Sequence, residues 1–200
     1  CVALGEEEYK EVLLCCARWH DTGKAHFIFA NAVLGSAREG DSPLPQGLMA
    51  KPMRKMPPYE RRGFRHELAS ALLWLAHGSM KEKDLIAYLI ASHHGKVRLA
   101  IRSIPGETEP PEPGRRFARG IWEGDKLPII TIPEAGDIPE TSLSLEVMEV
   151  GDGDMGESWS TRAQRLLRCF GPFRLAWYEA LLCIADRRAS AKEREDVNAL

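Results

Sequence analysis

The chain has 200 residues, of which 44% are hydrophobic and 28% are charged. This length and composition fit one soluble globular domain with a sizeable core, or one domain that carries an insertion. The formal net charge of -2 excludes a strongly basic nucleic-acid binder of the histone kind, although a local basic groove in a neutral protein is enough to bind nucleic acid. No apolar run approaches the length of a membrane span and no signal peptide is visible, so we expect no membrane partner.

The cysteines indicate a reducing compartment. The chain has five cysteines: Cys1, Cys15, Cys16, Cys169 and Cys183. None forms a CxxC pair, and three of the five lie in apolar helical stretches, as is typical of reduced, buried cysteines. We therefore expect a cytoplasmic protein without disulfides or a zinc-thiolate site. The chain opens on Cys1 rather than Met, with a helical pattern already under way at Glu6, so we expect an N-terminally truncated fragment of a longer chain.

Apolar residues at helical spacing predict the first two helices. The acidic residues 6–8 suit the N-terminal end of a helix over 6–16. This helix should deliver His20 and Asp21 at its far end, with Gly23 as its stop. A second helix is predicted over about 25–34, and the glycines and prolines of 35–58 predict a long surface loop.

The later part of the chain alternates between helical and extended patterns. Helices are predicted over about 59–76 and 81–93, and again over 158 or 160 to 169 and over 172 to about 194. Prolines exclude helix from 105 to 113, and two β-like runs, 127–132 and 142–150, predict a hairpin in an insertion of about 103–157. The predicted fold is mostly α, a helical bundle with a Pro/Gly-rich loop and a small β-hairpin-containing insertion, and 1–200 form one domain.

Imidazoles and carboxylates recur at the ends and on the inner faces of four predicted helical segments. Mixed nitrogen and oxygen donors suit borderline divalent metals, and helix ends can aim them at one point. Asp186 shares a helix face with the apolar Leu175 and Leu182, where a carboxylate is costly unless it is paired or binds a metal. The candidate metal ligands are His20, Asp21, His66, His93, His94 and Asp186.

Each candidate also has an ordinary structural explanation. A core histidine can donate to a backbone carbonyl, as His66 would, and His93-His94 can be a polar helix terminus. Asp186 can pair with Arg187 or Arg188. His26 and His77 belong to no supporting pattern, and we interpret them as structural or surface residues. Taken together and in this order, the six candidate ligands favour a metal site, because several helices must contribute to a dinuclear centre.

Basic residues near the candidate ligands suggest an anionic substrate. Lys24, four residues after His20, is placed to meet a phosphate oxygen at the rim of the site. Lys96 and Arg98 follow the double histidine and are candidates for binding a nucleic-acid backbone. A solvated face explains these two residues equally well, and it explains the arginines of the insertion better.

Four motifs occur in an order that resembles the HD superfamily of metal-dependent phosphohydrolases, and most closely the HD nuclease domain of the CRISPR-associated helicase-nuclease of type I interference. They are His20-Asp21-Thr22-Gly23-Lys24, Phe64-Arg65-His66-Glu67, His93-His94-Gly95 and Ala185-Asp186-Arg187-Arg188-Ala189-Ser190. The resemblance implies a helical domain with two metals bridged by Asp21. One metal would be held by His20, Asp21 and Asp186, and the other by Asp21, His66, His93 and His94.

The resemblance also implies a reaction and its partners. Members of the family cut single-stranded DNA that a helicase unwinds after a guide-RNA surveillance complex has recognised the target. Asp21 and Lys24 would then be catalytic, and the histidine ligands would favour Mn, Fe, Co or Ni over Mg. The helicase would lie in the same parent chain or be a separate partner. One departure is that no histidine precedes His20, where the family has a further one, and we expect truncation to be the reason.

Two other functions are compatible with parts of the sequence. An HD phosphohydrolase of nucleotides or cyclic dinucleotides is the alternative, but the first class usually has histidine where Lys24 stands and the second has a Gly-Tyr-Pro signature that is absent here. A non-catalytic docking module is supported by the missing first-site histidine alone.

Overall fold

The computed structural model describes residues 7–35, 56–154 and 156–198, and its architecture is mainly helical. Within these residues there are five α-helices and only short antiparallel strands of two or three residues, which confirms the predicted mostly-α class. The central part of the Pro/Gly-rich loop predicted over 35–58 lies outside the described residues. No helix in the described part of the chain combines the length and apolar character needed to cross a membrane.

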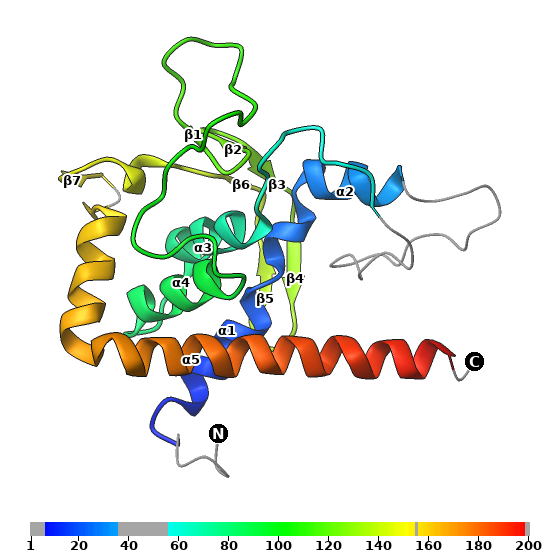
Figure 1. Ribbon diagram of the computed structural model, residues 1–200, viewed down its shortest axis with the longest axis vertical. Helices are drawn as coiled ribbons and strands as arrows, with labels where there is room; N and C mark the ends of the chain where they lie inside the picture. The colour runs from blue at the N-terminus through cyan, green and yellow to red at the C-terminus, as the bar shows by residue number, and fades with distance from the viewer. Residues whose placement is uncertain (1–6, 36–55, 155, 199–200) are drawn as a thin grey trace.

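The helices α3 (His66–His77) and α4 (Lys83–Ser92) follow one another in the sequence, pack antiparallel and form the centre of the fold (Figure 1). Every residue of 67–75 in α3 and of 85–92 in α4 is buried. A helix that is apolar on all sides is stable only when other elements surround it. α1 (Lys10–Trp19) and α5 (Trp159–Asn198) supply that cover, and both contact α4.

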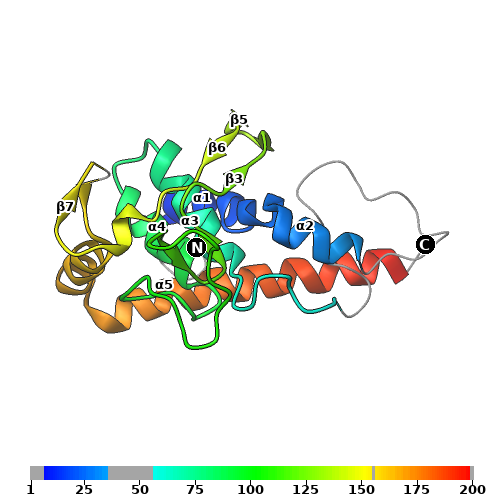
Figure 2. The same cartoon turned by 90° about the horizontal axis from the view of Figure 1, so that it is seen from above.

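The long helix α5 is two helices joined at a kink. Gly171 has φ 74° and ψ 160°, outside the helical region, and Pro172 begins the second part. Proline fits the first turn of a helix because it has no N–H to leave unpaired and its φ is already helical. The predicted division between 169 and 172 is therefore confirmed. Figures 1 and 2 both show the C-terminal part of α5 running past the α3–α4 centre.

Two predicted helix starts are wrong. α1 begins at Lys10 rather than at residue 6 and continues to Trp19. The helix predicted from 59 begins only at His66, because the preceding segment turns at Gly63, with φ +94°. Arg65 is extended and its N–H donates to the carbonyl of Arg119. These interactions with the insertion replace a first helical turn that the local sequence alone would allow.

The insertion holds short antiparallel pairs: β1 (Phe117–Ala118) with β2 (Ile121–Trp122), β3 (Lys126–Leu127) with β6 (Thr141–Ser142), β4 (Ile130–Ile132) with β5 (Gly136–Ile138), and β7 (Asp152–Gly153) with β8 (Gly156–Glu157). The two predicted runs, 127–132 and 142–150, meet only at their edges, where Leu127 pairs with Thr141 and Lys126 with Ser142. The longer pairing is the β4–β5 hairpin, in which 130–132 pairs with 136–138 instead. The strand predicted over 142–150 is wrong beyond Ser142, and Glu146–Met148 is a 3-10 helix. The N–H of Leu145 donates to the Glu123 carboxylate at 2.7 Å, which ends strand pairing, although Leu143 and Val147 are buried.

A buried ionic cluster joins the insertion to the segment before α2 (Phe27–Leu34). His26 is completely buried, and its Nδ1 accepts from the N–H of Ile28 at 3.2 Å. Its Nε2 therefore carries the proton and donates to Asp125 Oδ2 at 3.1 Å. Arg61 also donates to Asp125 and lies over the Trp122 ring. The interpretation of His26 as structural is confirmed, as it is for His77, whose Nε2 lies 2.7 Å from Thr141 Oγ1.

Candidate metal centre

The segment after α1 is fixed against α3 by a close backbone approach. His20 is the C-terminal cap of α1, and a 3-10 helix, η2 (Thr22–Ala25), follows Asp21. The N–H of Gly23 donates to Ser70 Oγ at 2.7 Å, and the same hydroxyl lies 2.8 Å from the His20 carbonyl oxygen. A Cβ at Gly23 would overlap the His66 carbonyl oxygen and the Ser70 nitrogen. Gly23 is therefore not the predicted helix stop but the residue that lets His20 and Asp21 reach α3.

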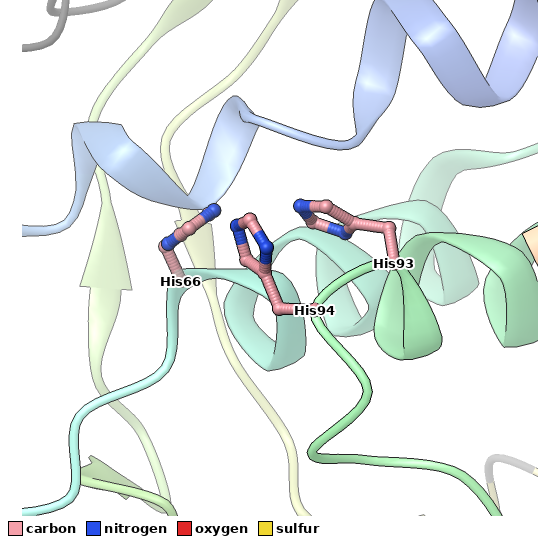
Figure 3. A group of neighbouring side chains, drawn as sticks. All are labelled: His66, His93 and His94. Carbon is pink, nitrogen blue, oxygen red and sulfur yellow. The ribbon is translucent and has the colours of Figure 1, made fainter. Parts of the chain in front are cut away.

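Three histidines approach this segment from α3 and α4. His66 is the first residue of α3, His93 caps the end of α4, and the chain turns at Gly95 with φ +72°. Figure 3 shows the rings of His66, His93 and His94 gathered together, and one nitrogen of each lies within 4.8 Å of the others. The centroids of the adjacent His93 and His94 rings are 4.0 Å apart. The end of α4 thus brings both rings to one place, as predicted.

Asp21 lies between imidazoles from different helices. Its Oδ1 is 3.2 Å from His66 Nε2, and its Oδ2 is 3.4 Å from His20 Nε2. Ligand atoms of His20, Asp21 and His93 also lie within 4.8 Å of one another. Asp186 reaches the same place from α5, with Oδ1 3.6 Å from His20 Nε2. The structure therefore brings together all six candidate metal ligands, and Asp21 presents an oxygen to each of two histidines.

Backbone carbonyls orient two of the imidazoles. His20 Nδ1 lies 2.8 Å from the Ala17 oxygen, and His93 Nδ1 lies 2.6 Å from the Ile90 oxygen. Because a carbonyl only accepts, each Nδ1 carries a proton, which leaves the Nε2 lone pair of the neutral ring directed at the cluster. Metal-binding histidines are commonly held in this way.

The imidazole nitrogens at the centre of the cluster are buried without hydrogen bonds. Nε2 of His20, of His66 and of His93 has no hydrogen-bond partner among the described residues. Buried polar atoms are rarely left unpaired, because desolvation is then uncompensated. Divalent cations bound here would satisfy these nitrogens and the neighbouring carboxylates. These residues fit a metal centre.

The electrostatics of the cluster favour metal-binding protonation states at Asp21, His93 and His94, but not at His20. Burial, reinforced by neighbouring His94, lowers the pKa of His93 to about 3, and burial together with His66 also lowers the pKa of His94. Burial opposes ionisation of Asp21, but His66, His20 and Lys24 outweigh it and hold the pKa of that carboxyl well below its usual range. Burial would lower the pKa of His20, but the Asp186 and Asp21 carboxylates raise it. The neutral forms of His93 and His94 and the ionised form of Asp21 are those that bind metal, whereas the raised pKa of His20 favours its protonated ring, whose proton a bound metal would displace.

Lys24 lies deeper than the predicted rim position. Its side chain is buried, and its Nζ forms an ion pair with Asp21 Oδ2. In this structure the ammonium group thus neutralises the central carboxylate. The predicted phosphate contact of Lys24 stays a prediction.

A cavity of about 540 Å³ lies beside the cluster, between the end of α4 and the second part of α5. His93, His94 and Asp186 line it together with Arg98, Glu179 and Arg187. Of the two residues predicted to bind nucleic acid, Arg98 lines this cavity, whereas Lys96 is exposed and does not. Of the two residues predicted to contact nucleic acid, Arg98 therefore lies beside the cluster and Lys96 lies on the outer surface.

Glu67 is part of the motif Phe64-Arg65-His66-Glu67, but no role in the site was assigned to it from the sequence. Its side chain is fully buried, and neither carboxylate oxygen has a hydrogen-bond partner among the described residues. Its Oε2 lies 3.7 Å from His66 Nδ1. In sequence, Glu67 is an ordinary acidic residue in a first helical turn, where the helix dipole favours it. Only its burial beside His66 distinguishes it as a residue able to orient that ligand.

A helical domain that gathers histidines and aspartates from four segments around one buried centre defines the HD class of metal-dependent phosphohydrolase. A family model described as "Cas3, HD domain" matches residues 2–194. The chain belongs to this family, and it is a CRISPR-associated, metal-dependent nuclease. Searches of curated proteins and of solved structures gave no match.

Proposed function

We propose that this chain cleaves single-stranded DNA in type I CRISPR interference, together with a helicase that exposes the strand. The observation that carries the proposal is the set of buried Nε2 atoms of His20, His66 and His93, which make no hydrogen bond with a described residue and gather around Asp21. The substrate, the helicase and the guide-RNA surveillance complex follow from membership of the family. Residues 1–200 would act as one cytoplasmic nuclease domain, with the insertion of about 103–157 as part of it.

Two divalent transition-metal ions would be held by this set of donors. His20, Asp21 and Asp186 would hold one, and Asp21, His66, His93 and His94 would hold the other. Imidazole-rich ligation favours Mn, Fe, Co or Ni over Mg, which prefers oxygen ligands. When bound, the ions would polarise the phosphate and lower the pKa of the attacking water.

The residues of the chain would supply position and charge. Asp21 is the proposed bridge, because its Oδ2 faces His20 and its Oδ1 faces His66. Lys24 pairs with Asp21 through a flexible side chain, and a phosphate oxygen offers its ammonium group an alternative partner. Arg98, and Lys96 further out, would contact the DNA backbone.

The proposal is tested by cleavage assays with the purified protein and added Mn²⁺ or Co²⁺. Single-stranded DNA should be degraded faster than duplex DNA, and chelation should abolish the activity. Hydrolysis of nucleotides or cyclic dinucleotides, with single-stranded DNA left intact, would establish the alternative phosphohydrolase function. Failure to bind any divalent metal in calorimetric titrations would leave a docking role instead.

A further inference from the structure

The cavity beside the candidate metal ligands has a cationic wall. His93, His94 and Asp186 lie on the metal-centre side, and Arg98 and Arg187 line the same space from two different elements. Arg98 comes from the segment that follows α4, whereas Arg187 lies on α5 directly after Asp186. The volume, about 540 Å³, lies in the range of pockets that take small molecules or single nucleotide units.

Arg98 is held in one orientation by a buried carboxylate. Its Nε donates to Glu179 Oε2 at 2.8 Å, and its Nη1 donates to the Gly95 carbonyl oxygen at 3.1 Å. Glu179 is buried, and its other oxygen accepts a hydrogen bond from the Tyr88 hydroxyl at 2.8 Å. Both oxygens of Glu179 are thus engaged, and the guanidinium keeps further N–H groups for an anion. A fixed guanidinium loses little entropy when it binds a phosphate.

Arg187 differs from its neighbour Arg188 in direction. Consecutive residues of an α-helix point about 100° apart. Both arginines are exposed, and Arg187 lines the cavity whereas Arg188 does not. The chain therefore contains a cation directed at the cavity and, one residue later, a cation of the same type directed elsewhere.

From this arrangement we propose that the cavity is a binding subsite for a backbone phosphate of single-stranded DNA, next to the phosphodiester that is cleaved. Arg98 and Arg187 bind this phosphate, and Glu179 with Tyr88 positions Arg98. The subsite rests on the proposed nuclease function, and it specifies which side of the metal centre the strand crosses. A flexible single strand can turn into such a cavity, whereas a duplex is too stiff and wide.

The test is binding of a fluorescent single-stranded oligonucleotide in the presence of a chelator, measured by anisotropy over a range of salt concentrations. Arg187→Ala and Arg98→Ala should each weaken binding roughly tenfold. Each should also reduce the slope of log K against log salt by about 0.7, the value for one lost phosphate contact to a single strand. Arg188→Ala is the matched control and should change the affinity less than about twofold, with an unchanged slope.

Equal effects of Arg187→Ala and Arg188→Ala would overturn the subsite, because unspecific charge would then explain both. Cleavage by the Mn²⁺-loaded protein separates this result from failure of the proposed function. If the wild-type protein cleaves DNA but the two variants bind alike, the subsite alone is wrong. If the wild-type protein cleaves no DNA, the nuclease proposal is wrong, and the anisotropy result then has no catalytic meaning.

Discussion

Two buried clusters of histidine, aspartate and a cation each include residues of the segment 20–26, and they differ in how their polar atoms are paired. In the cluster of His26, Asp125 and Arg61, both ring nitrogens of His26 are hydrogen bonded and Asp125 accepts from His26 and Arg61. In the cluster around Asp21, Nε2 of His20 and of His66 makes no hydrogen bond with a described residue. Similar side chains therefore serve stability in the first cluster and leave coordination sites open in the second.

The comparison shows which observation identifies a metal centre. A buried imidazole costs free energy unless both nitrogens are satisfied. The Asp125 cluster meets this requirement with protein groups alone, so it needs no ligand. The Asp21 cluster leaves three imidazole nitrogens without a hydrogen bond among the described residues, and bound cations would satisfy them. Variants that keep side-chain size while removing charge can separate the two roles.

The largest effect is expected for Asp21→Asn. The amide removes the charge shared between the two proposed metal positions but keeps an oxygen near Lys24. Mn²⁺-dependent cleavage of single-stranded DNA should fall by about a thousandfold or more, equivalent to roughly 4 kcal/mol of transition-state stabilisation. Single-turnover assays measure the loss. Full activity in this variant would contradict the central role of Asp21.

Asp125→Asn should instead act on stability. It leaves the buried Arg61 without its ionic partner, and the free energy of unfolding should fall by about 3 kcal/mol at neutral pH. Urea denaturation measures this change, and metal stoichiometry per folded molecule should stay the same. A loss of metal binding in a folded Asp125→Asn protein would show that the two clusters are not separate.

The difference in stability between wild type and Asp125→Asn should depend on pH. Burial alone would raise the pKa of Asp125, but His26 and Arg61 outweigh burial and lower it. Because the pKa of Asp125 is lowered in the folded protein, its ionised carboxylate stabilises the fold at pH values above the ordinary aspartate pKa of 3.8. This stabilisation is lost as the pH falls through the folded-state pKa. The stability difference between wild type and Asp125→Asn should therefore shrink below about pH 4. A constant difference would contradict the ionic role.

Gly23→Ala tests the close contact between the backbone at Gly23 and α3, which positions the cluster around Asp21. The new methyl group overlaps the His66 carbonyl oxygen and the Ser70 nitrogen, so the unfolding free energy should fall by about 2 kcal/mol and metal affinity should also fall. Gly35→Ala is the control, because the nearest atom to its Cβ is 3.2 Å away and the change should be much smaller. Denaturation and calorimetry measure both quantities. Equal destabilisation by the two variants would contradict the steric explanation.

The smallest effect is expected for Glu67→Gln. The amide weakens the orienting interaction with His66 Nδ1, so metal affinity should fall about tenfold. The metal-free protein should not lose stability, because the substitution removes a buried charge that has no hydrogen bond among the described residues. Calorimetric titration with Mn²⁺ and urea denaturation distinguish the two outcomes. Unchanged affinity would restrict Glu67 to a packing role.

Local patterns predicted the helical elements well and their ends less well. The buried faces of α3 and α4, the turn at Gly95 and the break before Pro172 follow from apolar spacing and from backbone preferences of glycine and proline. The helix predicted from 59 failed because Arg65 bonds to Arg119, a residue of the insertion. The strand predicted to continue to 150 failed because Glu123 takes the N–H of Leu145. Both errors come from partners that are distant along the chain.

By itself the sequence determined the helical class and, through the order of its motifs, the six residues that meet at the candidate metal centre. It could do so because helix ends, adjacent histidines and an aspartate on an apolar face are local features. Only the tertiary structure decided that His26 Nε2 is hydrogen bonded to Asp125, 99 residues away, while His20 Nε2 makes no hydrogen bond with a described residue. It also decided that Lys24 is buried against Asp21 and that Arg187, not Arg188, lines the cavity. Hydrogen-bond satisfaction depends on which atoms meet in space, and local sequence does not contain that information.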